Sequence, residues 1–235
     1  ASSSRPPRTT ATASPPPSGS LITSAFFNQG FTDTDSPVTV SFGGAFATPP
    51  VVVCSLRTDA KPARPLQVRV GSVTTTSARV YLQTMTNPTE SLSGTGFEAV
   101  CMAVAPGQYN EADHGIKMEA VRYEDGTTIS GHLHGWNAAP RSYLNSYTNP
   151  VVIGFVQSDN DDLWSVFLQY GTSRSAPPSN TVLNVGRSVM KDSDGARLDE
   201  TVGYVVMEAG TYEPSLFGGR GIAVGETGTT VQGVD

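Results

Sequence analysis

The sequence Phe46-Ala-Thr-Pro-Pro-Val-Val-Val53 and its near copy Tyr147-Thr-Asn-Pro-Val-Val-Ile153 decide the fold of this chain. Each places an aromatic residue shortly before proline and continues as a run of β-branched residues, which favour strands. The two runs lie about 100 residues apart, which is the length of one small domain. This pairing predicts that the chain contains two copies of one β-rich unit.

Two further matches recur at nearly the same interval. Residues 101–109 match residues 205–212, and residues 124–131 match residues 226–233. Because the last of these elements returns near residue 226, we expect a third copy of the unit to begin there. The sequence therefore predicts two copies and the start of another.

The composition favours an all-β chain. Among the 235 residues there are 24 glycines and 17 prolines, and only 15% are charged, against about 25% in an average globular domain. Apolar and polar residues alternate in Leu66-Gln-Val-Arg-Val70, as in a strand with one buried face, and no long window has helical periodicity. We therefore predict an all-β fold of two tandem antiparallel β-sandwich domains.

The predicted organisation has four parts. They are a Ser/Thr/Pro-rich extended tail at 1–20, one sandwich at 21–109, a second at 110–213, and the start of a third repeat or an assembly strand at 214–235. The tail has too little apolar surface to fold alone, and its hydroxyl and proline content suits O-linked glycans. Because the chain opens at Ala1 in a run of small residues, we expect that a signal peptide or tag has been removed.

Two cysteines, Cys54 and Cys101, lie in the apolar runs Val-Val-Val-Cys-Ser and Glu-Ala-Val-Cys-Met-Ala-Val. Both runs are expected to be core strands of one sandwich, so a disulfide or two buried thiols would fit. We predict the disulfide, since a secreted protein meets oxidising conditions. No second cysteine or histidine stands at metal spacing, and no zinc site is expected.

A longer pattern in the first copy resembles the H-type lectin domain, and the second copy resembles it more weakly. The resemblance is carried by residues 38–42, 46–53, 68–76 and 96–104, and then by residues 147–153 and 200–210. It implies a six-stranded antiparallel sandwich of a kind often assembled as trimers. It also implies binding of galactose or N-acetylgalactosamine near the subunit contacts.

Arginine, acidic and aromatic side chains are the candidates for a glycan surface, because sugars stack on rings and offer hydroxyls to polar groups. The candidates are Arg57, Asp59, Arg64 and Arg69 in the first copy, and Trp136, Asp161, Trp164 and Arg174 in the second. The alternative is that each tryptophan belongs to an ordinary core. Met85, rather than the tryptophan of the family pattern, follows Thr84. This departure favours a shared fold over shared sugar binding.

The charge and the absence of motifs argue against several classes of function. A net charge of -6 gives no basic field for nucleic acid, and no apolar stretch is long enough to enter and span a bilayer. The sequence has no nucleophile elbow, zinc-protease motif or phosphate loop, so we expect no catalytic residues and no cofactor. His132 and His134, and the acidic run at 192–200, are interpreted as solvated surface rather than metal sites.

The start of the third copy supplies the expected assembly residues. They are Gly221, Ile222, Gly228, Thr229, Thr230 and Val231. Strand addition between molecules through these residues would make head-to-tail contacts, and such contacts generate filaments when they do not close into rings.

We therefore expect a non-enzymatic, secreted or cell-surface protein with a structural and adhesive role. It is expected to be glycosylated, and its expected partners are further molecules of itself and glycans. One alternative is a secreted lectin module for galactose-type sugars. Another is the carbohydrate-binding part of a larger secreted enzyme.

Overall fold

The computed structural model describes residues 24–31, 37–58, 66–84, 97–125, 135–160, 163–173, 175–190, 197–213 and 222–225. The predicted all-β fold is confirmed, because these residues form antiparallel sheets and, among them, a single short helix. None of the helical residues in these ranges forms a segment long and apolar enough to cross a membrane.

The first half of the molecule contains two three-stranded sheets, with strand orders β1-β6-β3 and β2-β5-β4. The strands are β1 (Ser24–Phe31), β2 (Val38–Ser41), β3 (Val51–Thr58), β4 (Leu66–Gly71), β5 (Ser77–Thr84) and β6 (Phe97–Val104). Alternate residues of both sheets point into one shared core, which includes Val52 and Ala99 from one sheet and Val80 from the other. Period-two alternation in the sequence therefore becomes one buried face on each sheet.

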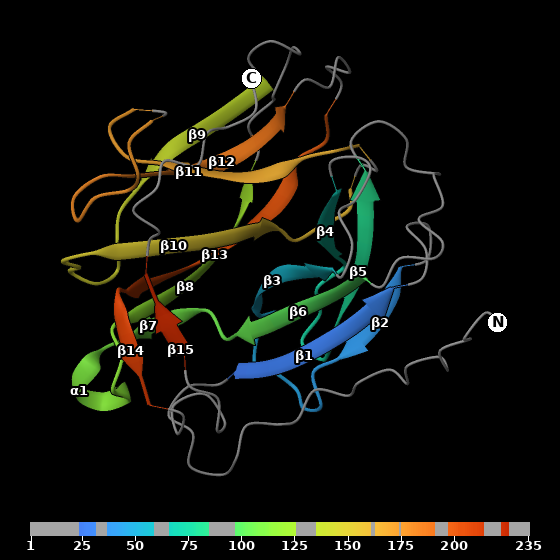
Figure 1. Cartoon of the computed structure of the whole chain (residues 1–235), viewed down its shortest axis with the longest axis horizontal. Coiled ribbons are helices and arrows are strands. Elements are labelled where there is room, and N and C mark those ends of the chain that lie inside the picture. Colours follow the sequence, from blue (N-terminus) through green and yellow to red (C-terminus); the bar gives the residue numbers. More distant parts are fainter. Residues whose placement is uncertain are drawn as a thin grey trace.

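The second half has the same strand order, β10-β13-β8 in one sheet and β11-β12-β9 in the other. Its strands are β8 (Met118–Asp125), β9 (Gly135–Arg141), β10 (Pro150–Val156), β11 (Val166–Tyr170), β12 (Leu183–Met190) and β13 (Glu200–Glu208). Val152, Val185 and Tyr204 belong to its core. In Figure 1, β10 lies beside β3 and β4, so this strand is where the two halves meet.

Strand register fixes which residues of the two halves are equivalent. Val104 of the central strand β6 pairs with Val51, and Met207 of the central strand β13 pairs with Val151. By this register, the paired cysteines Cys54 and Cys101 correspond to Gly154 and Tyr204.

The two halves fill this equivalent position differently. Cys54 and Cys101, which are paired across β3 and β6, form a disulfide. At the other position the ring of Phe167 occupies the space that a Cβ atom on Gly154 would need, and the same ring lies 6.4 Å from that of Tyr204. A covalent link in the first half is thus replaced by aromatic packing in the second.

Each half is followed by a short strand with the same local contact. These strands are β7 (Gly107–Tyr109) and β14 (Gly210–Tyr212). The Tyr109 hydroxyl donates to the carbonyl oxygen of Ala105 at 2.7 Å, and the Tyr212 hydroxyl donates to that of Glu208 at 2.5 Å. The sequence match between 101–109 and 205–212 therefore corresponds to one recurring turn.

The strands that follow these turns are also equivalent. Strand β7 leads through the single-turn helix α1 (Glu111–His114) and pairs with the beginning of β8, while β14 pairs with β15 (Ile222–Val224). Ala120 faces Gly107 in one pair, and Val224 faces Gly210 in the other. Strand β15 therefore has the place that the first strand of the second half has after β7.

A third core cluster joins the halves. Val51, Val53 and Val104 of the first half pack together with Val205 and Met207 of the second. The predicted boundary between residues 109 and 110 falls inside this shared region, and β7 pairs with the sheet of the second half. The two halves therefore share buried surface and pack against each other. The predicted tail at 1–20 lies outside the described residues.

Removing the disulfide should destabilise the first half. The bond closes a segment with a sequence separation of 47 residues, for which loop entropy predicts a contribution of about 2–4 kcal/mol. We expect Cys54→Ala combined with Cys101→Ala, or reduction of the unaltered chain, to lower the midpoint of denaturant unfolding. Unfolding curves with and without reductant provide the measurement, and identical midpoints would contradict the disulfide.

Candidate functional site: the buried junction between the halves

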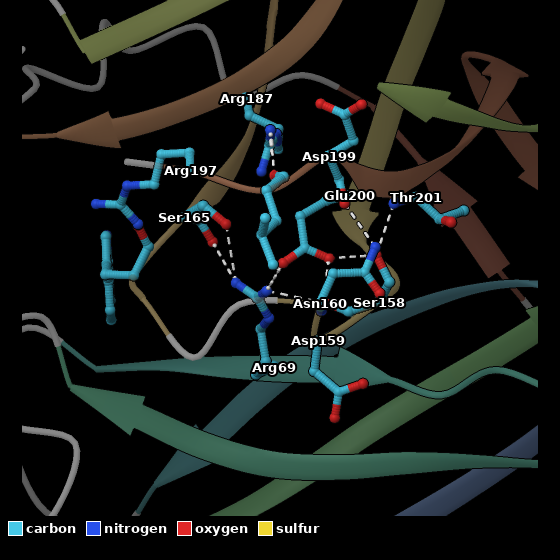
Figure 2. Close-up of polar contacts among 12 residues, drawn as sticks. Arg69, Ser158, Asp159, Asn160, Ser165, Arg187, Arg197, Asp199, Glu200 and Thr201 are labelled. Carbon is cyan, nitrogen blue, oxygen red and sulfur yellow. Dashed lines mark hydrogen bonds and ion pairs between the residues drawn. The ribbon is translucent and has the colours of Figure 1, made fainter. Parts of the chain in front are cut away.

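The strongest concentration of buried charge lies where the two halves meet. Arg69 on β4 donates from Nη2 to Oε1 of Glu200, the first residue of β13, at 2.8 Å. Their side chains are 1% and 0% exposed. Figure 2 shows the Arg69 guanidinium reaching from the first half toward Glu200 and Ser165 of the second.

Further hydrogen bonds complete the surroundings of this ion pair. Arg69 also donates to the Ser165 hydroxyl at 2.9 Å and to the carbonyl oxygen of Ser158 at 3.0 Å. The second carboxylate oxygen of Glu200 accepts from the Ser158 hydroxyl and from the backbone N–H of Asn160. Both charges are thus held by fixed partners, as buried charges require.

The segment that follows β10 clasps the first half at two more points. Asp159 accepts from Arg79 at 2.7 Å and from the Ser72 hydroxyl at 3.0 Å. A Cβ atom on Gly71 would lie 2.7 Å from Asp159 Cγ, so glycine is needed for this close approach. The Gln157 side-chain amide donates to the carbonyl oxygen of Val52 at 2.8 Å. Residues 157–160 therefore form a polar clasp across the junction.

Two more arginines lie near the junction, beside the segment that precedes β13. Arg187, which is 0% exposed, donates to the carbonyl oxygen of Leu198, and Arg197 donates to that of Trp164. These bonds hold the segment before β13 and so position Glu200 at the start of its strand.

A cavity of about 270 Å³ adjoins the ion pair between the halves. Its walls are largely apolar, with Leu56, Phe155 and Phe167 among them, and Gln67 is one of the few polar groups. Gln67 donates to Gln83 and to the carbonyl oxygen of Ser165. The cavity carries no acid and base pair, and its volume is at the small end for a ligand site.

A second buried carboxylate fixes the loop after β9. Glu119 on β8 is fully buried and accepts from the backbone N–H groups of Leu144 at 2.7 Å and Asn145 at 3.1 Å. It also accepts from the Tyr147 hydroxyl at 3.3 Å. Burial raises the pKa of the Glu119 carboxyl, although these hydrogen bonds act in the opposite direction. The pKa of the Tyr147 hydroxyl is also raised, first by burial and then by the nearby Glu119 charge.

The described residues hold no cluster of three or more histidine, cysteine or acidic side chains that could bind a metal ion. At the junction Arg69 pairs with Glu200 and Arg79 with Asp159, and the other two arginines donate to backbone carbonyl oxygens. Such an arrangement can fix the relative position of the halves.

Of the predicted glycan residues, Arg57, Arg69 and Trp164 have side chains that the structure describes. Arg57 is exposed and pairs with Glu98 at 3.2 Å, whereas Arg69 is buried in the junction. Trp164 is 5% exposed, which agrees with the alternative that it belongs to a core. Neither Arg69 nor Trp164 is therefore accessible to a glycan.

The remaining predicted residues fall largely outside the described part of the chain. Strand β9 includes the backbone of Trp136, but its side chain is not described. Ile222 begins β15. Asp59, Arg64, Asp161, Arg174, Gly221, Gly228, Thr229, Thr230 and Val231 lie outside the described residues.

The partners of Arg69 stand out little from their surroundings in the sequence. Glu200 ends an acidic run for which solvated surface is the expectation, Ser158 lies in the polar run 157–162, and Ser165 is a lone serine between Trp164 and Val166. Glu119 carries a weak signal, since it stands between Met118 and Ala120 in an otherwise apolar run. Pairing between distant residues creates these sites, across the junction for Arg69 and within the second half for Glu119, and no local pattern encodes it.

Comparison with protein-family models, with curated proteins and with solved structures found no match for this chain.

Breaking the buried ion pair should be costly. In Arg69→Met the Glu200 carboxylate stays buried without its cation, and loss of one partner of such a pair costs about 3–5 kcal/mol. We expect the combined variant Arg69→Met with Glu200→Leu to regain most of this loss, because no charge is then left unpaired. Denaturant unfolding measures both.

The pair of Arg57 and Glu98 is the control for this experiment, because the Arg57 side chain is 73% exposed and that of Glu98 is 12% exposed. The substitution Arg57→Met should change the free energy of unfolding by less than about 1 kcal/mol. Equal effects of Arg57→Met and Arg69→Met would contradict the role given to the junction.

Glu119 and Glu208 should affect stability with opposite dependence on pH. Because the folded state raises the pKa of Glu119, stability contributed by its proton is present at low pH and declines as pH rises through the raised pKa. The pKa of Glu208 is lowered: partial burial opposes the shift, but the backbone N–H groups of Thr148 and Asn149 and the charge of Lys117 outweigh it. Its stabilising effect is therefore lost as pH falls through the lowered pKa.

The measurement is the free energy of unfolding between pH 3 and 8 for Glu119→Gln and Glu208→Gln. Glu119→Gln should remove a decrease in the free energy of unfolding with rising pH, and Glu208→Gln should remove an increase in it. Profiles shifted in the same direction would contradict these assignments.

Proposed function

We propose that this protein is a non-enzymatic extracellular structural and adhesive protein, built from H-type-lectin-like repeats that pack side by side and associate with further copies. The observation that carries the proposal is the buried ion pair of Arg69 and Glu200, which fixes one repeat against the next. A structural role needs a fixed geometry between repeats, and a buried charge pair tolerates little change in register.

The polar clasp at residues 157–160 and the shared apolar cluster support the same role. Together they join β3 and β4 of one half to β8, β10 and β13 of the other. The equivalent residues Val104 and Met207 both belong to this cluster, so the outward faces of equivalent sheets pack against each other. Ion pairing, packing and backbone contacts would all resist bending at the junction.

An extracellular location is supported by the disulfide of Cys54 and Cys101, since such bonds persist in oxidising compartments. The Ser/Thr/Pro-rich composition of residues 1–20 supports glycosylation outside the cell. The buried junction, rather than an open catalytic cleft, is the reason to propose a non-enzymatic role.

A lectin is the second candidate, favoured by a hollow of about 470 Å³ beside the start of β10. Thr148, Asn149, Ser179 and Asn180 line it and offer hydroxyl and amide groups to a sugar. In this alternative the chain binds galactose-type glycans as a discrete module, or acts as the carbohydrate-binding part of a larger secreted enzyme.

The full chain should form species larger than its 24.7 kDa mass in a concentration-dependent way. Sedimentation velocity and negative-stain microscopy are the measurements, and a glycan array with the same preparation tests the second candidate. A chain that stays monomeric and binds sugars would favour the lectin. A chain that associates and ignores sugars would favour the structural role.

A further inference from the structure

The cavity of about 270 Å³ at the junction has walls from both halves. Leu56 and Val68 come from β3 and β4 of the first half, and Phe155 and Phe167 come from β10 and β11 of the second. Each of these strands is hydrogen-bonded into a sheet. The walls are therefore held in place by the fold, as in a largely preformed binding site.

Most of the lining residues are apolar, and two of them carry aromatic rings. Phe155 packs against the core of the first half and against the shared cluster. Glycine at position 154 lets the Phe167 ring lie against the backbone of β10, where a Cβ atom would collide with it. Because an apolar cavity of about 150 Å³ is enough for benzene, this one has room for a single ring with small substituents.

The polar lining residues are Gln67, Arg69 and Ser165. Arg69, which Figure 2 shows reaching Ser165, is already bonded to that residue and to Glu200. The side-chain amide of Gln67 donates to Gln83 and to the carbonyl oxygen of Ser165. No described residue donates to Oε1 of Gln67, and this atom is not fully buried. The cavity therefore offers this oxygen as an acceptor in a largely apolar space.

These walls define the chemistry of a ligand. The Gln67 oxygen needs an O–H or N–H donor, and a sugar would leave most of its hydroxyls without partners among apolar walls. Because Glu200 already pairs with Arg69, a charged ligand would find no free counterion there. A small phenol has a ring of the right size and one neutral hydroxyl that can donate.

We propose that this cavity is a binding site for a small neutral phenol. The ring lies among Leu56, Phe155 and Phe167, and the hydroxyl donates to Oε1 of Gln67. The inference goes beyond the proposed structural role and does not depend on association between molecules. Because both halves supply walls, a bound ring joins them beside the ion pair.

The hydrogen bond is tested on the full chain with para-fluorophenol and para-fluorotoluene, each followed by its fluorine NMR signal. The two probes have nearly the same shape, and only the first has a hydroxyl. In Gln67→Leu the affinity for para-fluorophenol should fall about tenfold, because the acceptor is lost, while para-fluorotoluene should bind as before. An equal change for both probes overturns the role of Gln67. Absence of saturable para-fluorophenol binding to the unaltered chain overturns the site.

The location is tested with Val166→Phe, which places a larger side chain in the wall of the cavity. Leu168→Phe is the matched control, since Leu168 lies on the same strand, is also partly exposed and does not line the cavity. Val166→Phe should abolish saturable binding of para-fluorophenol, and Leu168→Phe should leave it unchanged. Undiminished binding to Val166→Phe overturns the location.

These outcomes are separate from those for the proposed function. A chain that binds para-fluorophenol and stays monomeric supports the site and not the structural role, and a chain that associates without binding it does the reverse. If Val166→Phe does not fold, the backbone amide resonances of Gly154 and Phe167 in the unaltered chain decide the location. They should shift during titration with para-fluorophenol, and unshifted resonances overturn the location.

Discussion

The ion pair of Arg69 and Glu200 is the constraint on which the arrangement of this molecule depends. Its two charges come from different halves, and both side chains are buried. Removing such charges from solvent carries a desolvation penalty of several kcal/mol per ion, which the partners must offset. The pair therefore contributes less to net stability than to position, because no other arrangement of the halves would leave both charges paired.

The groups around the ion pair help to offset this desolvation penalty. Arg69 donates to the Ser165 hydroxyl and to the backbone carbonyl oxygen of Ser158, and Asp159 of the same segment binds Arg79. Gly71 leaves room for that segment to approach. The apolar cluster around Val51 and Val205 lies on the neighbouring strands, so the junction combines packing with a polar clasp of defined register.

The two halves show how one topology tolerates different means of stabilisation. The disulfide of the first half and the ring of Phe167 over Gly154 in the second occupy equivalent positions. Likewise Phe97 begins the central strand of the first half, where the charged Glu200 begins that of the second. Phe97 lies in the core of its own half, whereas Glu200 lies at the junction. Divergence between the copies is concentrated where their surroundings differ.

The sequence by itself determined the strands, their all-β class and the recurrence of the turn that ends in Tyr109 and Tyr212. These features depend on local alternation, turn residues and β-branched runs, which neighbouring residues express directly. It also led to the prediction of a disulfide between Cys54 and Cys101. Only the tertiary structure decided that Arg69 is a junction residue and not a glycan ligand, that Glu119 holds a loop, and that Gln67 lines a cavity between the halves. Burial and charge pairing join residues more than 100 positions apart, as in the 131-residue separation of Arg69 and Glu200, and no local pattern carries that information.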